Sequence, residues 1–120
     1  MSSARNEFVD YVVELMAGWA PVSARRMFGG YGLYREGRMC ALIVDDELFF
    51  KTDKDNVAQF ERAGCHPFVY VSQSRTVRMS YWSALEGSLE STAEMNDWCQ
   101  SAYGTALRAH AGKASKGKRK

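Results

Sequence analysis

Two short turns in the middle of the chain constrain its fold more than any other feature of the sequence. They are Glu36-Gly37 and Asp45-Asp46, residue pairs typical of tight chain reversals. Segments rich in aromatic and aliphatic residues flank them and are predicted to be strands, at residues 25–28, 32–35, 39–44 and 48–51. A parallel connection needs about a dozen residues or more, so such short turns make neighbouring strands antiparallel. The last three segments therefore predict a meander of three strands.

One helix is predicted before this meander in the sequence and another after it. The N-terminal helix ends before Pro21, and its apolar residues recur at helical spacing: Phe8, Val12, Leu15, Met16 and Trp19. A short second helix begins at Asp53, its expected N-cap, and ends at Gly64. We expect its inner face to carry Val57, Phe60 and Ala63.

A hairpin and a long helix complete the predicted order of elements. Residues 68–72 and 76–82 have the alternation of two paired strands. Residues 91–94 (STAE) form a capping box that begins the last helix, which we expect to end at about Ala109 or Ala111. The resulting order, α-β-β-β-α-β-β-α, predicts an α+β domain in which helices pack on an antiparallel sheet.

Positive charge is concentrated at the C-terminal end of the chain. The formal net charge is +2, but five basic residues lie in the last eight positions without an acid among them: Lys113, Lys116, Lys118, Arg119 and Lys120. Removing these five charges leaves −3, so the rest of the chain lacks the broad basic face that phosphate backbones usually require. We expect a single domain over residues 1–111 and a disordered basic tail over residues 112–120.

Residues that carry catalysis or bind metals in other proteins are scattered along this chain. Cys40, Cys65 and Cys99 match neither a disulfide framework nor the spacing of zinc ligands. His66 follows Cys65, but adjacent side chains of an extended chain point in opposite directions and do not form a nucleophile and its base. We therefore expect no enzyme activity, no catalytic residue, no cofactor and no metal site. Because no apolar run approaches the roughly 20 residues of a membrane span, we also expect a cytoplasmic protein without membrane contact.

A glycine-rich stretch, Gly29-Gly30-Tyr31-Gly32, is the most conspicuous local motif. Backbone N–H groups beside glycines bind phosphate in several kinds of loop. This stretch lacks the Lys-Ser/Thr of a P-loop, and a strand rather than a helix is expected after it. We therefore expect a bulge or kink in the first hairpin instead of a phosphate site.

Three motifs carry a resemblance to a known family. Residues 26–34 (RMFGGYGLY), residues 46–53 (DELFFKTD) and residues 79–82 (MSYW) are similar to the signature of the N-terminal domain of the TfoX (Sxy) competence-regulator family. The resemblance covers about residues 22–106. This chain departs from the family pattern after Trp82, where residues 83–87 (SALEG) replace a proline-containing segment. Longer members carry a second, helical domain, whereas this chain ends in its lysine-rich segment.

The resemblance implies a non-enzymatic regulatory or adaptor domain linked to the control of competence genes. Such a domain is expected to bind another protein, or a second copy of itself, through an edge strand of the sheet or the loop of residues 82–88. The alternative is a nucleic-acid-binding regulator that uses Arg25, Arg26 and the lysine tail. The candidate interaction residues are Arg25, Arg26, Gly29, Gly30, Tyr31, Tyr81 and Trp82.

Overall fold

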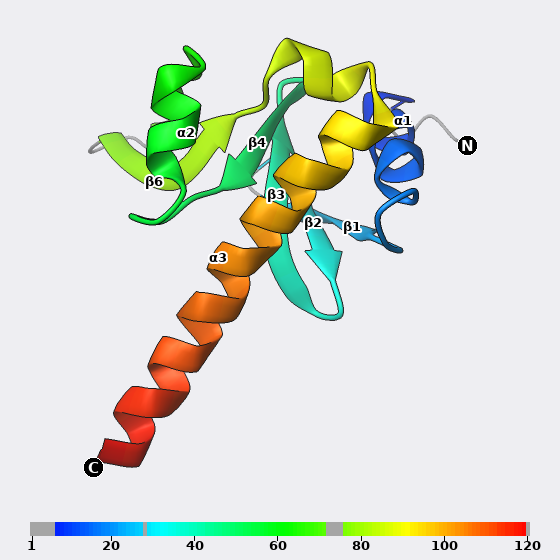
Figure 1. Ribbon diagram of the computed structural model, residues 1–120. Helices are drawn as coiled ribbons and strands as arrows, with labels where there is room; N and C mark the ends of the chain where they lie inside the picture. The colour runs from blue at the N-terminus through cyan, green and yellow to red at the C-terminus, as the bar shows by residue number, and fades with distance from the viewer. Residues whose placement is uncertain (1–6, 28, 72–75, 120) are drawn as a thin grey trace.

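The computed structural model describes residues 7–27, 29–71 and 76–119. Its helices are α1 (Glu7–Met16), α2 (Val57–Arg62), the 3-10 helix η2 (Glu86–Leu89) and α3 (Thr92–Arg119). Its strands are β1 (Ser23–Met27), β2 (Gly30–Arg35), β3 (Arg38–Val44), β4 (Glu47–Lys51), β5 (Pro67–Val71) and β6 (Thr76–Ser83). Figure 1 shows α3 crossing the sheet diagonally, with α1 beside its beginning. The predicted α+β class is confirmed.

The six strands form one antiparallel sheet in the order β1-β2-β3-β4-β6-β5. Four strand segments are predicted before α2, of which the predicted order of elements counts only the last three, and the structure has all four. The additional strand, β1, pairs with β2 from Ser23 opposite Tyr34 to Met27 opposite Gly30. Gly29 permits this tight hairpin, because its φ of 78° lies in the left-handed region that glycine adopts without strain. β1 and β5 are consequently the two edges of the sheet.

The two turns predicted at the centre of the chain are confirmed. Glu36 and Gly37 connect β2 to β3, and Asp45 and Asp46 connect β3 to β4. All four residues have positive φ, at 52°, 81°, 53° and 60° respectively. Positive φ at both central residues is the geometry of two-residue hairpin turns, whose twist matches that of the flanking strands.

The main core lies between the helices and one face of the sheet. It contains strand residues that alternate along β2, β3, β4 and β6, among them Leu33, Ile43, Phe50 and Trp82. The three α-helices also contribute buried residues to this core. They are Val9, Val12 and Met16 of α1, Phe60 of α2, and Met95, Cys99, Ala102 and Tyr103 of α3. This core holds the helices on a single face.

A second, smaller cluster lies on the opposite face of the sheet. Its buried members are Leu42, Phe49, Phe68 and Tyr81, and Met39, Val44 and Met79 pack against them. Leu42, Phe49 and Tyr81 are each next to a main-core residue in sequence, as Phe49 is to Phe50, so they point to the other face. All these residues come from strands, and none of the described helices contributes to the cluster.

The second helix begins later than predicted. Its N-cap is Asn56 rather than Asp53, because residues 53–56 first form a turn in which the Val57 N–H donates to the Asp53 carbonyl at 3.0 Å. Phe60 is buried as predicted, whereas Ala63 is exposed. Gly64 ends the helix with a φ of 82°, which confirms the predicted left-handed stop.

The last helix is longer than predicted. Its start is confirmed, since Ser91 Oγ accepts a hydrogen bond from the Glu94 N–H at 3.3 Å. The helix passes through Gly104 and continues to Arg119, beyond the end predicted at Ala109 or Ala111. Alanine and lysine, which favour helix, are frequent in this segment and proline is absent, and the helix continues through Gly112 and Gly117 although glycine disfavours it. The domain boundary at residue 111 and the disordered basic tail over residues 112–120 stay predictions.

Figure 1 shows this end of α3 extending away from the sheet. None of the helices in the described ranges is both long enough and apolar enough to cross a membrane.

Candidate functional site

The β5 edge is the most apolar exposed strand among the described residues. β5 pairs with β6 on one side and is last in the strand order. Its sequence, PFVYV, has no charged residue. Val69, Tyr70 and Val71 are 42%, 38% and 69% exposed, and the other large hydrophobic side chains exposed in the described part of the chain are Tyr11 and Leu107. Three consecutive apolar side chains are therefore presented to solvent along one edge.

The beginning of β5 is held firmly against the sheet. The Phe68 side chain is buried, with its ring centre 5.0 Å from that of Phe49. Just before the strand, the His66 N–H donates to Ser83 Oγ at 3.0 Å, and the His66 carbonyl accepts from the Ser83 N–H at 2.8 Å. His66 Nε2 also lies 3.0 Å from a Glu47 carboxylate oxygen. β5 is thus fixed at its start and along β6, and no other strand of the described ranges pairs with its outer side.

The β1 edge has the opposite chemistry. Ser23, Ala24, Arg25 and Arg26 are all exposed, so β1 is held chiefly by its pairing with β2. The two arginines point to opposite faces, because successive side chains of a strand alternate. The Arg25 guanidinium lies over the Tyr34 ring, 5.0 Å from its centre. This edge therefore presents positive charge on both faces.

The glycine stretch forms a turn and a close approach, and an irregularity of the kind expected, a bulge or kink, lies just beyond it. Gly29 lies in the β1–β2 turn, and a Cβ on Gly30 would lie 2.1 Å from the Ile43 carbonyl oxygen. The register shift of this hairpin region occurs further on, between Leu33 and Tyr34 of β2 where it pairs with β3. Tyr31, the remaining candidate here, is half-buried and packs against the main core.

A hollow of about 280 Å³ beside the glycines does not suit a phosphate. It is lined by Gly29, Gly30, Tyr31, Ile43, Asp45 and Asp46. The two aspartates carry negative charge and are exposed at its rim. Because like charges repel, this hollow disfavours an anion.

Tyr81 and Trp82 lie inside the molecule rather than at an interaction surface. Each is 7% exposed, with Trp82 in the main core and Tyr81 in the second cluster. Burial raises the pKa of Tyr81 to about 12. The following loop is also packed, since the Ala84 N–H donates to the Leu48 carbonyl at 2.8 Å and Ser88 is fully buried. The structure therefore gives these residues a packing role.

The perturbed titratable groups are explained by burial or by an ion pair. Burial raises the pKa of the Cys40 thiol to about 11, and it also raises the pKa values of Cys65 and Cys99. Hydrogen bonds from Arg108, at 2.8 and 3.0 Å, lower the pKa of Asp53 and join the start of the α2 segment to α3. Within the described residues, no three His, Cys, Asp or Glu side chains lie close enough to hold a metal ion.

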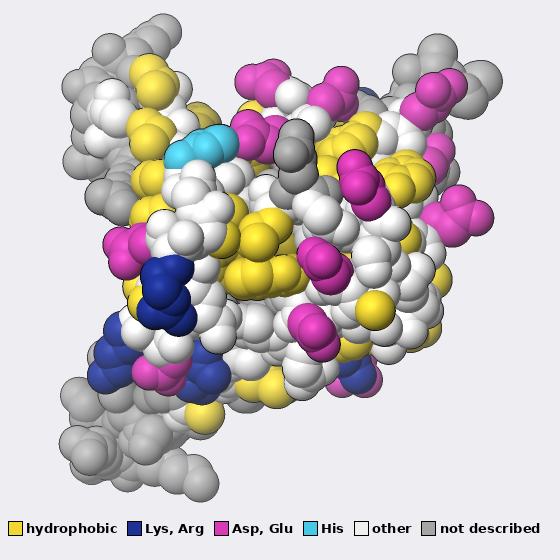
Figure 2. Space-filling view, turned by 45° about the horizontal axis from the view of Figure 1, so that its top comes forward, with side chains coloured by type: hydrophobic (Ala, Val, Ile, Leu, Met, Phe, Trp, Pro, Cys, Tyr) yellow, Lys and Arg dark blue, Asp and Glu magenta, His cyan; other side chains and the backbone are white. Residues whose placement is uncertain are grey.

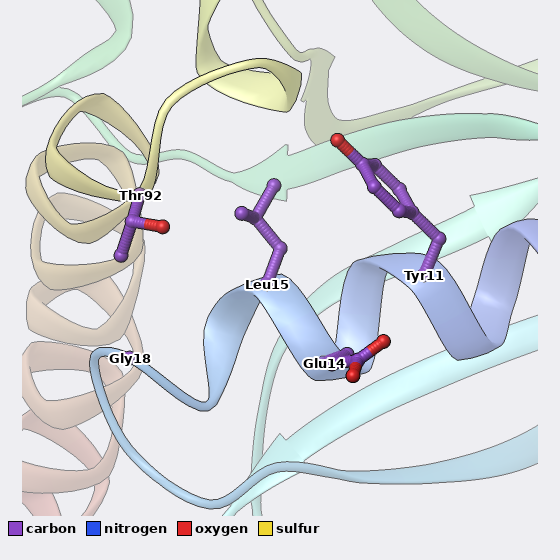
Figure 3. A pocket seen from close by; sticks show the side chains of 5 residues that line it. All are labelled: Tyr11, Glu14, Leu15, Gly18 and Thr92. Atoms are coloured by element: carbon purple, nitrogen blue, oxygen red, sulfur yellow. The ribbon is translucent and has the colours of Figure 1, made fainter.

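A shallow hollow of about 310 Å³ lies where α1 meets the beginning of α3. Figure 3 shows Tyr11 and Leu15 on one side of α1, with Thr92 of α3 across from Leu15. Gly18 allows this approach, since a Cβ there would lie 2.6 Å from Thr92 Cγ2. The Tyr11 hydroxyl donates to the Leu89 carbonyl, so the polar end of this ring is already bound within the chain. The hollow is the gap left by helix packing.

The fold and its edges define a small α+β domain with an open apolar strand. A family model described as the TfoX N-terminal domain matches residues 14–106. The chain therefore belongs to this family, and the match extends the resemblance seen in the sequence into α1. The DNA transformation protein TfoX1 of Aliivibrio fischeri (strain ATCC 700601 / ES114) is 30% identical over 86 residues, covering 72% of this chain and 39% of that relative. The chain thus corresponds to well under half of the longer protein.

Proposed function

We propose that this chain is a non-enzymatic regulatory domain that serves DNA transformation by binding another protein along β5. The family and the name of its relative support the link to transformation. The observation that carries the mechanism is the uncharged β5 edge, with three exposed apolar side chains in a row. An extended segment that joins such an edge gains backbone hydrogen bonds and covers apolar surface at the same time.

The state of the thiols supports a role without catalysis. A cysteine nucleophile works as the thiolate, which requires a lowered pKa. Burial instead raises the pKa values of Cys40, Cys65 and Cys99, so they remain thiols at neutral pH. The nearest imidazole in sequence, that of His66, is paired with Glu47.

Cross-linking inside cells tests this proposal. A photo-reactive phenylalanine analogue replaces Tyr70 in one variant and Tyr11 in a matched control, since both tyrosines are partly exposed, at 38% and 46%. We expect the Tyr70 variant to give a discrete adduct with another protein and the Tyr11 variant to give none.

The same cells are then assayed for transformation. We expect Val71→Lys to lower the frequency of DNA transformation and to remove the adduct, because lysine blocks edge pairing. Full transformation in a strain that lacks the gene would refute the regulatory role. Equal adducts at Tyr70 and Tyr11 would refute the role of the edge.

The β1 edge supports a second candidate, direct binding to nucleic acid. Arg25 and Arg26 are exposed on adjacent positions of an edge strand. The molecule nevertheless lacks a broad basic face on the side shown in Figure 2, where acidic side chains are widespread and Lys and Arg gather mainly at the lower left. The test is binding to duplex DNA at low and moderate salt, with and without residues 113–120. Sequence-specific binding that survives moderate salt would favour this candidate, and its absence would exclude it.

A further inference from the structure

We propose that β5 is also a self-association site, at which the β5 strands of two copies pair antiparallel across a twofold axis. This inference rests on the edge used in the proposed function and names a second copy of the chain as an occupant. In the free protein the two sheets would then join into one continuous sheet.

The chemistry of β5 suits a second copy because the strand is complementary to itself. In a twofold antiparallel pair centred on Val69, that residue faces its own copy, Phe68 faces Tyr70, and Pro67 faces Val71. Each pairing places an apolar residue opposite an apolar residue, and no charged side chain is present. Such cross-strand contacts stabilise a sheet, whereas like charges directly opposite destabilise it.

The other edge strand, β1, is not complementary to itself in this way. A twofold pair centred on Arg25 of β1 would place that guanidinium opposite its own copy, and one centred between Arg25 and Arg26 would place the two arginines opposite each other. Like charge therefore opposes self-pairing of β1 in these two registers, whereas no register of β5 brings like charges together. Twofold pairing at β5 alone gives a closed dimer, while pairing at both edges would give an open chain of molecules.

Pairing at β5 would also extend the apolar surface that the second cluster forms on one face of the sheet. Phe68 belongs to the second cluster, where its ring lies 5.0 Å from Phe49, and Tyr70 continues the same face toward the edge. Val69 and Val71 alternate with these residues and so lie on the other face, beside Arg78 and Thr76 of β6, where they are 42% and 69% exposed. A second β5 strand would bring four valines together on that face and four aromatic rings on the other.

The length of β5 predicts a weak dimer. Five residues of strand span about 17 Å. A pair of strands of that length buries less surface than the roughly 800 Å² per partner of a standard stable interface. We therefore expect a dimer that forms at high protein concentration and dissociates on dilution, which leaves the edge available to a different partner strand.

Sedimentation over a wide range of protein concentration tests the inference. The variants are Val69→Lys and the matched control Leu107→Lys, because these side chains have nearly equal exposure, 42% and 40%, and only the first lies on β5. Val71→Lys is a second edge variant at a more exposed position, where misfolding is least expected. Circular dichroism checks that all variants keep the fold.

The wild-type mass is expected to rise toward that of a dimer with concentration. Val69→Lys and Val71→Lys should each raise the dissociation constant at least about tenfold, and Leu107→Lys should leave it unchanged. A wild-type chain that stays monomeric at every concentration, or a dimer that folded Val71→Lys does not weaken, overturns the inference.

The same variants separate this inference from the proposed function. If the chain is monomeric but Val71→Lys still lowers transformation, the edge binds another protein and only the self-association fails. If Val71→Lys abolishes the dimer but leaves transformation intact, self-association stands and the proposed function fails.

Discussion

The two edge strands of the sheet are similar in length and opposite in chemistry. β1 carries Arg25 and Arg26, is exposed over most of its residues, and is held chiefly by its pairing with β2. β5 carries no charge, buries Phe68, and exposes Val69 to Val71. Charge on an edge strand is a common protection against unwanted pairing. From this difference we expect β1 to resist pairing with other strands and β5 to allow it.

The largest expected effect is on stability, when the side chain that anchors β5 to the sheet is removed. Phe68→Ala would leave a cavity beside Phe49 and should lower the free energy of unfolding by about 3 kcal/mol. Because Phe68 anchors the edge, amide exchange should accelerate in β5 more than in β1. The measurements are urea denaturation and hydrogen exchange. A loss below about 1 kcal/mol would show that the edge does not depend on this ring.

A somewhat smaller effect concerns the attachment of β1. Gly30→Ala places a Cβ 2.1 Å from the Ile43 carbonyl oxygen and should cost about 1–3 kcal/mol. Gly29→Asn is the control, because Gly29 has open space around it and asparagine tolerates positive φ. Thermal unfolding should rank the two variants in that order, and the reverse order would contradict the close approach at Gly30.

Removing the charge from β1 should allow two β1 strands to pair, as we propose for β5. Replacing both Arg25 and Arg26 with valine, in a chain that also carries Val71→Lys, is expected to strengthen association through β1 by about tenfold or more over Val71→Lys alone. Sedimentation velocity measures this change. If the triple variant stays as monomeric as its parent, the arginines are not what keeps β1 unpaired.

The smallest effect is expected away from both edges. Arg108 lowers the pKa of Asp53 below its usual value of 3.8, so the folded state favours the carboxylate. Its contribution to stability is therefore present above that usual value and is lost as the pH falls through the lower, folded-state pKa. Both partners are partly exposed, and Asp53→Asn should cost less than about 1 kcal/mol at neutral pH.

The pH series provides the corresponding check. The difference in unfolding free energy between wild type and Asp53→Asn should shrink toward acid pH, while association through β5 at neutral pH should stay as in wild type. A difference that grows toward acid pH would contradict the sign of the pKa change.

The sequence predicted the parts of the fold that depend on local chemistry. The turns at residues 36–37 and 45–46 and the cap at Ser91 are encoded in a few adjacent residues, and all three are confirmed. Residues 25–28 are predicted as a strand but are not counted in the meander, because the two short turns join only the three segments that follow.

The candidate site was harder to predict because exposure depends on strand order. β5 follows β4 and α2 along the chain, but in the sheet β6 lies between β4 and β5. This insertion leaves Val69 to Val71 at the edge and places Tyr81 and Trp82 of β6 inside. The absence of charge in residues 67–71 is the sequence feature that could have pointed to this edge. Local sequence, however, does not show which strand is outermost in the sheet.

Hydrogen exchange at low and high protein concentration tests the central comparison most directly, because both edges are read in the same molecule. We expect the backbone amides of Val69 to Val71 to exchange more slowly at high concentration and those of Ala24 to Met27 to stay unchanged. Val71→Lys should abolish the slowing. Slowing at β1 alone, or no slowing at either edge, would contradict the assignment of β5 as the open edge of this domain.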